Sequence, residues 1–297
     1  MLGQTMETNP NNIFIAYLLG ILALIGFGGT LPITKIALND FSPEFITFGR
    51  SLIAALLAMV LLLLFRKKLY HENNIEIFIA GLLLIFGFPG LMAFAMQTVP
   101  AAHGGVVLGF LPLTTAIIAR MITEEKPSNM FWFLSILGCV IVAFYTYLKI
   151  DEAGQSGISL GDLYLVLAGL CASGGYVIFG KLSRITPGWE ITSRSLMLNL
   201  PLILIGFLWT FEPQYASPSL NGILSLLYVS IISMFLAFFA WNAALAKGGI
   251  ARIGQLQLLQ TFATLILSAL FLGEHLDGVT IITAIIITAI IAISKRL

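Results

Sequence analysis

The chain has 297 residues, of which 59% are apolar and only 10% are charged, and its net charge at pH 7 is +1. Soluble domains carry about 25% charged residues, so this composition excludes a water-soluble globule with an ordinary surface and predicts an integral membrane protein. The near-neutral charge also excludes a nucleic-acid-binding surface.

Apolar runs of about 20 residues, the length that crosses a bilayer as a helix, recur between short polar breaks. Ten such runs follow in chain order: 13–32, 45–65, 75–97, 106–121, 131–148, 160–182, 191–211, 223–245, 253–272 and 279–294. We expect the first run to be retained, because it lacks the basic head and the cleavage site of a signal peptide. Alternating strands of barrel length are absent, so the sequence predicts an all-α integral membrane fold with ten transmembrane helices.

The distribution of basic residues predicts the orientation. With the N-terminus inside, twelve of the 15 Lys and Arg residues fall on the cytoplasmic side, and only Lys35, Arg50 and Lys149 fall on the outer side. This is the usual sense of the positive-inside rule. We therefore expect a multi-pass protein of a bacterial inner membrane, with a cytoplasmic tail at 1–12 and both termini in the cytoplasm.

The two halves of the chain show similarities that indicate a duplication. Glu125 and Glu274 end the fourth and ninth runs and are 149 positions apart, and Arg50 and Arg194 open the second and seventh runs, 144 positions apart. Each copy has five spans, an odd number, so the second copy would be inverted in the membrane. Inverted repeats are typical of transporters that alternate access around a site near the midplane. The predicted five-helix repeats are 13–150 and 151–297.

The ninth run carries polar residues on one side of its helix. At 100° per residue, five side chains lie within an arc of about 100°. They form what we call the polar stripe: Gln257, Gln260, Thr261, Thr264 and Ser268. Unpaired amides in hydrocarbon are costly, so the stripe should face protein or a hydrated cavity. Each residue alone suits helix packing, whereas the stripe as a whole favours a cavity wall that binds a polar small molecule.

Other polar and aromatic residues lie inside the apolar runs. The further candidates for substrate binding are Thr30, Gln97, Tyr176, Trp241 and Asn242, with helix packing as the alternative. The first-repeat equivalents of the polar stripe are mainly apolar: Leu108, Leu111, Pro112, Thr115 and Ala119. A cavity with one polar and one apolar wall would suit an amino acid with a large hydrophobic or aromatic side chain.

Charged residues avoid the middle of every run, where each would cost at least about 2.5 kcal/mol. Those at run ends are expected to act as interfacial anchors or in helix-end ion pairs. The structural or gating candidates are Lys35, Arg50, Pro112, Glu125, Arg194 and Glu274. A proton-coupled drug exporter generally needs a buried carboxylate, so the pattern favours a neutral or zwitterionic substrate and downhill transport.

Several short patterns occur at characteristic places along the chain. They are Gly28-Gly29 and Lys35 in the first run, Arg50-Ser51 in the second, Pro112 in the fourth, the run ends at Glu125 and Glu274, and Gly161-Asp162-Leu163 at the start of the second half. Together they resemble the drug/metabolite transporter superfamily, in its ten-helix EamA-like branch, over nearly the whole chain. Phe27 stands where that family often has a tryptophan, and Thr261 stands where the first repeat has Pro112. The resemblance implies export of amino acids or other small metabolites through a cavity between the halves.

Two alternatives to this exporter are an exporter of another metabolite or drug with proton coupling, and a membrane-embedded enzyme. An enzyme needs acid, base or metal ligands that converge at one depth. The three histidines at 71, 103 and 275 are scattered, and an HExxH motif is absent. We therefore expect neither an enzyme nor a metal or cofactor. The expected partners are a small-molecule solute and the lipid bilayer, and a monomer suffices because it holds both repeats.

Overall fold

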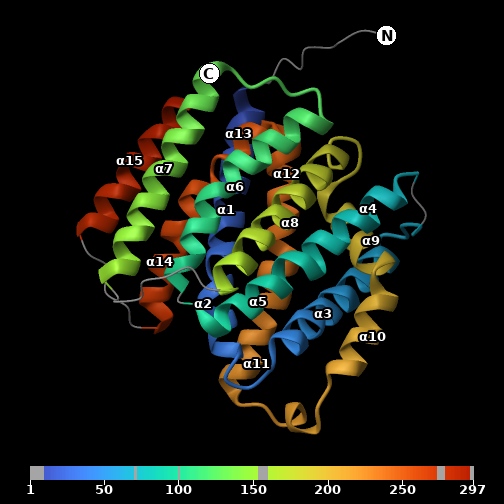
Figure 1. Cartoon of the computed structure of the whole chain (residues 1–297). Helices are drawn as coiled ribbons and strands as arrows, with labels where there is room; N and C mark the ends of the chain where they lie inside the picture. The colour runs from blue at the N-terminus through green and yellow to red at the C-terminus, as the bar shows by residue number, and fades with distance from the viewer. Residues whose placement is uncertain (1–9, 70–71, 100, 153–159, 273–277, 295–297) are drawn as a thin grey trace.

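The structure is a computed structural model that describes residues 10–69, 72–99, 101–152, 160–272 and 278–294. Every regular element within these ranges is a helix (Figure 1). The first half contains α1 Pro10–Gly28, α2 Thr30–Ala37, α3 Pro43–Leu64, α4 Asn74–Gly81, the π-helix η1 Leu82–Gly87, α5 Phe88–Thr98, α6 Ala101–Ile122 and α7 Asn129–Glu152. The second contains α8 Leu160–Leu182, α9 Gly188–Leu198, α10 Leu200–Thr210, the 3-10 turn η2 Pro213–Ala216, α11 Leu220–Leu227, the π-helix η3 Tyr228–Leu236, α12 Ala237–Gly248, α13 Ile250–Gly254, α14 Gln257–Leu272 and α15 Gly278–Ser294.

Six helical segments of the described chain are long and apolar enough to cross a membrane. They are Asn12–Ala37, Pro43–Leu64, Asn74–Thr98, Leu160–Leu182, Leu220–Gly248 and Ile250–Phe271. The pair α9 and α10, which is bent by 55°, supplies a seventh crossing if it is one span. Shorter apolar helices lie at Gly109–Ile122, Asn129–Tyr145 and Ile281–Ile293. The predicted all-helical, multi-pass membrane fold is thereby confirmed, and each of the ten predicted runs overlaps one of these segments.

Some spans are interrupted near their prolines. The bend between α9 and α10 lies at Asn199, two residues before Pro201. Proline lacks a backbone donor and clashes with the preceding turn, so the regular helix cannot continue there. The six-residue π-helix η1 likewise ends just before Pro89. Pro112 is different, because α6 continues through it from Ala101 to Ile122.

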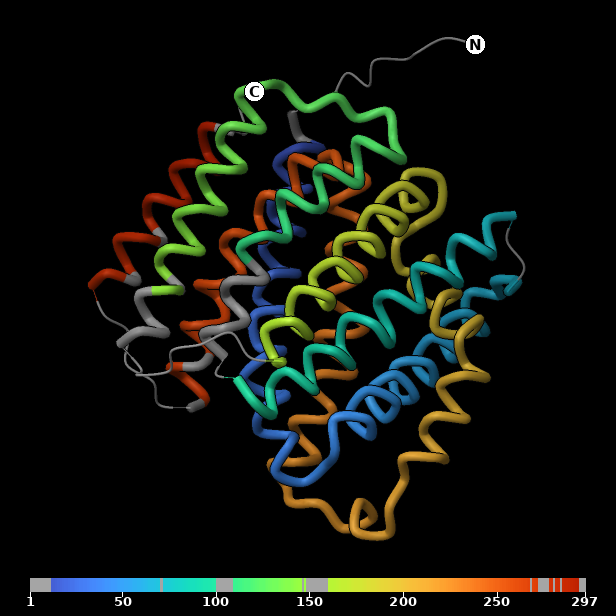
Figure 2. The backbone as a smooth tube through the Cα atoms, viewed as in Figure 1, coloured from blue at the N-terminus to red at the C-terminus, as the bar shows by residue number. Residues whose placement is uncertain are grey.

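The helices form one bundle in which segments far apart in sequence lie side by side. Helices α7 and α15 pair at one edge, and α10 lies at the opposite edge (Figures 1 and 2). Helix α1 packs against α12 and α14, and α8 packs against α5 and α6. The main buried core joins apolar side chains from both halves of the chain.

The contact between α1 and α14 depends on a small residue. A Cβ atom added at Gly28 would lie only 2.8 Å from the Cβ of Ala263 and 3.2 Å from the backbone nitrogen of Thr264. Glycine therefore lets the two backbones approach closely, as small residues commonly do between membrane helices. This approach brings the polar stripe of α14 next to the junction of α1 and α2.

Candidate functional site

The polar stripe lies inside the protein. Gln257 and Gln260 are 1% and 4% exposed, and Thr261 and Thr264 are equally buried. Both amide atoms of Gln257, Oε1 of Gln260 and the two threonine hydroxyls have no hydrogen-bond partner among the described residues. The fifth member, Ser268, has a side chain outside the part of the structure that is described.

Such unsatisfied groups are costly. A buried polar atom without a partner costs about 1–3 kcal/mol. Because several of them converge on one helix face, water or a bound polar molecule is the physical means of satisfying them. The arrangement fits a solute-binding surface better than a dry helix contact, in which amides pair with one another.

A neighbouring glutamine shows what a packed amide looks like in the same span. Gln255 lies on another face and is 2% exposed, and its Nε2 donates to Ser135 Oγ of α7 at 2.8 Å. The helix is interrupted at Gln255 and Leu256, between α13 and α14 and just before the polar stripe begins. The span therefore has one amide that joins helices and a separate face whose amides are unpaired.

Thr30, another predicted pocket residue, lies two residues beyond the α1–α14 contact at Gly28. Its Oγ1 is 2.7 Å from Ser233 Oγ in η3, and both residues are buried. The sequence patterns did not single out Ser233. It lies within a nine-residue π-helix, a distortion that is frequently found at functional sites.

Tyr176 and Trp241 come together in a buried group of rings. Their ring centroids are 5.7 Å apart, and Phe27 and Phe238 complete the group, at 5.1 Å from each other. We call these four residues the aromatic cluster. The indole Nε1 of Trp241 has no partner among the described residues. Sequence reasoning missed Phe238, although it lies one turn before Trp241 on the same helix.

The remaining predicted pocket residues have other surroundings. Asn242 is buried, and its Nδ2 donates to Thr192 Oγ1 at 3.0 Å, which joins α12 to α9. Gln97 is exposed near the C-terminal end of α5, and Lys35 is exposed on α2. The structure therefore does not bring Gln97 to the buried polar stripe, because the last turn of α5 reaches the surface.

Arg50 departs from the expected anchor or ion pair at a helix end. It is the eighth residue of α3 and is only 3% exposed. Its Nη2 donates to Ser233 Oγ at 3.1 Å, and no described carboxylate lies within 4 Å of the guanidinium. The reason is that Ile46, and not a carboxylate, lies one turn before Arg50, so no acidic side chain reaches the guanidinium from the preceding turn of α3.

Arg194, by contrast, forms a helix-end ion pair. Its Nη2 lies 2.6 Å from Glu190 Oε1, one turn earlier on α9, and its Nη1 donates to the carbonyl of Leu69. Lys67 approaches the other oxygen of Glu190 at 2.8 Å. The charge of Arg194 is therefore balanced within the protein.

Glu125 joins three helix ends. Its carboxylate accepts hydrogen bonds from the backbone nitrogens of Ile250 at 2.7 Å and Ala251 at 2.8 Å, at the start of α13. It also pairs with Arg184, which follows α8. A negative charge is favourable at a helix N-terminus. Its predicted counterpart, Glu274, lies outside the described residues.

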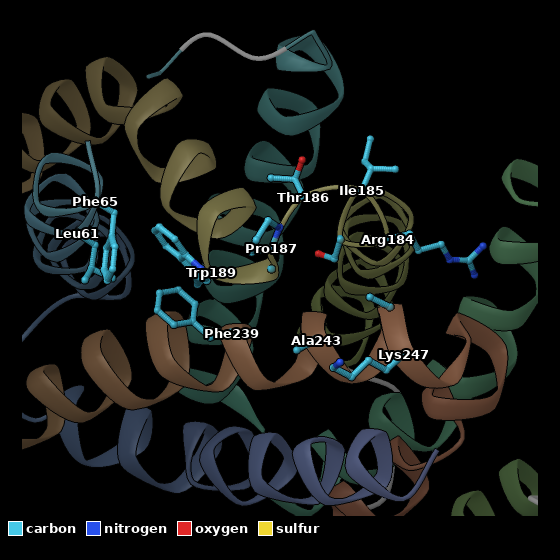
Figure 3. A pocket seen from close by; sticks show the side chains of 13 residues that line it. Leu61, Phe65, Arg184, Ile185, Thr186, Pro187, Trp189, Phe239, Ala243 and Lys247 are labelled. Carbon is cyan, nitrogen blue, oxygen red and sulfur yellow. The ribbon is translucent and has the colours of Figure 1, made fainter. Parts of the chain in front are cut away.

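A groove of about 830 Å³ lies apart from the polar stripe (Figure 3). It is bounded by the end of α3, the connection between α8 and α9, and α12. Phe65 and Trp189 pack at 5.1 Å on one side of it, and Arg184 points away from them. The groove is mostly apolar, and none of the predicted substrate-binding residues lines it.

Among the described residues, no group of three or more His, Cys, Asp or Glu side chains converges as the ligands of a metal ion would. The two cysteines, Cys139 and Cys171, are both free thiols. The buried groups of the candidate site are thus the amides and hydroxyls of the polar stripe, the rings of the aromatic cluster and the guanidinium of Arg50.

Comparison with known proteins shows what the chain is similar to. A model of the EamA-like transporter family matches residues 14–147 and again 159–295. The uncharacterized transporter YdeK of Bacillus subtilis is 36% identical over 279 residues, covering 93% of this chain and 96% of its own. A chloroplastic WAT1-related protein of Arabidopsis thaliana is 23% identical, covering 88% of this chain and 63% of its own.

A solved crystal structure has the same fold. It superposes with a TM-score of 0.75 and 18% identity, over 95% of this chain and 96% of the other. The family match spans most of the sequence, and both the family and YdeK are described as transporters. The chain belongs to the EamA-like transporter family of the drug/metabolite transporter superfamily.

Proposed function

We propose that this transporter exports a small neutral or zwitterionic metabolite, with hydrophobic or aromatic amino acids as the favoured substrates. The observation that carries the proposal is the polar stripe. Four of its side chains are at most 4% exposed, yet they hold polar atoms that have no partner among the described residues. Groups that can both donate and accept hydrogen bonds suit an uncharged or zwitterionic polar solute.

Alternating access requires two halves that can rock around this surface, and reciprocal packing supports inverted repeats. Helix α1, in the first span, packs against α12 and α14 of the second half, while α8, in the sixth span, packs against α5 and α6 of the first half. Corresponding helices also meet as pairs: α3 with α9, α6 with α14, and α7 with α15. A two-fold relation between the halves produces this exchange of contacts.

Helix directions agree with ten alternating crossings. Added Cβ atoms at Gly20 and Gly28 would meet Leu256 and Ala263 respectively, so α1 and α14 run in the same direction. Gly20 faces Ala244 while Gly26 faces Ala237, so α1 and α12 run in opposite directions. The first and ninth spans must be parallel, and the first and eighth antiparallel, if the chain crosses at every predicted run. An even number of crossings would put both termini on one side, and the distribution of Lys and Arg favours the cytoplasmic side of an inner membrane.

The aromatic cluster and the polar stripe together favour amphipathic solutes. The aromatic cluster provides apolar rings, and the polar stripe provides amides and hydroxyls. Small-molecule sites commonly combine an apolar wall with a few polar groups that set orientation. A hydrophobic amino acid presents both surfaces, whereas a strongly polar one would leave the rings without an apolar partner.

Downhill transport is the favoured energetic mode. Glu190 is the buried carboxylate of the described chain, and it is held by Arg194 and Lys67. Two cations keep it ionised, so it is poorly suited to exchange a proton for a substrate. Proton-coupled export of another metabolite or drug is the alternative, and a substrate-dependent proton flux in vesicles would favour it.

The test is efflux from proteoliposomes loaded with a mixture of amino acids and other metabolites and analysed by mass spectrometry. The wild type should release hydrophobic and aromatic amino acids in preference to strongly polar ones. Gln257→Ala and Gln260→Ala should reduce that release by about tenfold, the effect of losing about 1.4 kcal/mol of binding free energy. Asn221→Ala, at an exposed amide in the first turn of α11, should behave as the wild type.

Two results would contradict the proposal. One is that the wild type releases no amino acid above the rate of empty liposomes. The other is that both glutamine variants lose hydrophobic and strongly polar amino acids equally, because the stripe would then have no role in selecting the solute.

A further inference from the structure

Arg50 is a buried cation with very few partners. A guanidinium has five N–H donors and stays charged in proteins. Within the described chain Arg50 makes one side-chain hydrogen bond, to Ser233, and its buried Nε has no acceptor. Buried charges are normally paired because their desolvation costs several kcal/mol. A buried cation inside a membrane protein therefore requires an anionic partner, and the described residues do not provide one.

The second half of the chain shows how such a charge is balanced by the protein itself. Arg194 occupies the position that corresponds to Arg50 at the offset of 144 residues, and Glu190 lies one turn before it. At the same offset the first half has Ile46, a buried apolar side chain. The carboxylate that neutralises one arginine is therefore replaced by an isoleucine beside the other.

A chain of two hydroxyl groups, those of Ser233 and Thr30, begins at Arg50. Ser233 Oγ lies 3.1 Å from Arg50 Nη2 and 2.7 Å from Thr30 Oγ1, so three different helical elements meet at this point. Thr34, one turn after Thr30 on α2, has a buried hydroxyl without a described partner. Guanidinium and hydroxyl donors together match the two oxygens of a carboxylate, and guanidinium–carboxylate pairs are commonly bidentate.

The aromatic cluster lies close along the chain to Thr30, whose hydroxyl contacts Ser233. The cluster packs its rings around Phe27, which is three residues before Thr30. A molecule whose acidic group is at Arg50 would thus have apolar rings close by for the rest of its structure. One positive charge balances one negative charge, so a monoanionic carboxylate fits better than a phosphate dianion.

We infer that Arg50, with Ser233 and Thr30, binds the carboxylate group of the transported solute. The inference rests on the proposed function and specifies it, because it names the chemical group that every substrate must carry. The amine is not part of this requirement. Amino acids and 2-keto acids with the same side chain should both be recognised at Arg50, whereas amino-acid amides and simple amines should not.

The first experiment needs no mutation. Wild-type proteoliposomes are loaded with four compounds that share the side chain of leucine: leucine, 4-methyl-2-oxopentanoate, leucinamide and isopentylamine. Release of the two carboxylates above the rate of protein-free liposomes, with the amide and amine leaving no faster than from those liposomes, supports Arg50 as the carboxylate site. Release of leucinamide as fast as leucine overturns the site but leaves amino-acid export standing. Release of the keto acid without leucine supports the carboxylate site and contradicts the export of amino acids. Release of none of the four compounds contradicts both the site and amino-acid export.

Variants separate this role from a structural one. Arg50→Gln should lower leucine release by about tenfold or more, while its melting temperature stays equal to or above that of the wild type, because an unbalanced buried charge is removed. Arg50→Lys should retain part of the release, since an ammonium keeps the charge but not the forked geometry. The matched control Arg194→Gln should lower the melting temperature, because Glu190 loses a partner, and should keep the preference for leucine over leucinamide.

Unchanged leucine release in a folded Arg50→Gln protein would overturn the inference. If that variant does not fold, the comparison of the four compounds in the wild type decides alone. A fall in melting temperature of Arg50→Gln as large as that of Arg194→Gln, with carboxylate preference retained, would assign Arg50 to structure instead.

Discussion

At the scale of single residues, the decisive property is whether a buried polar group has a partner. Gln255 and Gln257 are separated by one residue and are both almost fully buried. The amide of Gln255 binds Ser135, whereas the amide of Gln257 has no described partner. At 100° per residue, two positions two residues apart lie on different faces of a helix, but this periodicity does not tell which face will be satisfied by protein.

This difference predicts opposite effects of the same substitution. Gln257→Leu should raise the free energy of unfolding by about 1–3 kcal/mol, because it removes an unpaired buried amide, while solute release falls. Gln255→Leu should lower the free energy of unfolding by about 1 kcal/mol, because Ser135 loses its partner. Thermal or denaturant unfolding of the purified variants, alongside efflux, measures both. Equal destabilisation by the two variants would mean that Gln257 has a structural role.

At the scale of helices, the spans are assembled from broken and distorted pieces. The breaks at Asn199 and at Gln255 to Leu256 and the π-helix at Tyr228–Leu236 lie within otherwise apolar runs. Composition predicted each run as a single helix, since hydropathy averages over such interruptions. Prolines lie beside two irregular places, Pro201 beside the bend at Asn199 and Pro89 beside the π-helix η1, but the π-helix that carries Ser233 has no proline.

The close contact between α1 and α14 gives a prediction for a whole element. Gly28→Val should force these helices apart, because even a Cβ at this position meets the backbone of α14. We expect a loss of about 1–3 kcal/mol in the free energy of unfolding, together with loss of transport, since α14 carries the polar stripe. Gly278→Ala is the control, because nothing lies within 4 Å of its added Cβ. Normal stability and transport in Gly28→Val would show that this contact is not needed.

At the scale of the whole molecule, the contacts between halves are reciprocal. The first helix of each half packs against the third and fourth spans of the other half, so neither half is a separate compact body. Such exchange explains why the core contains residues from both ends of the chain. It also places Arg50 of the first half beside Ser233 of the second, at the boundary across which alternating access would move.

An even number of crossings makes a prediction about topology. Reporter fusions at the N-terminus and after residue 297 should both report the cytoplasm, and a single cysteine replacing the exposed Gln214 should react with an impermeant reagent from outside the cell. This residue lies in η2, between the seventh and eighth predicted crossings, and is exposed. Termini on opposite sides would mean an odd number of crossings, which an inverted pair of equal repeats does not allow.

The sequence by itself determined the all-helical membrane class, the approximate places of the apolar helices, the burial of the described members of the polar stripe and the resemblance to the family. These properties depend on composition and on periodicity within one helix, which are local. Only the tertiary structure decided that Arg50 lacks a described carboxylate partner, that Glu125 joins α13 to Arg184, and that four aromatic rings form one cluster. Arg50 and Ser233 are 183 positions apart, and no local pattern encodes which distant side chain will satisfy a buried charge.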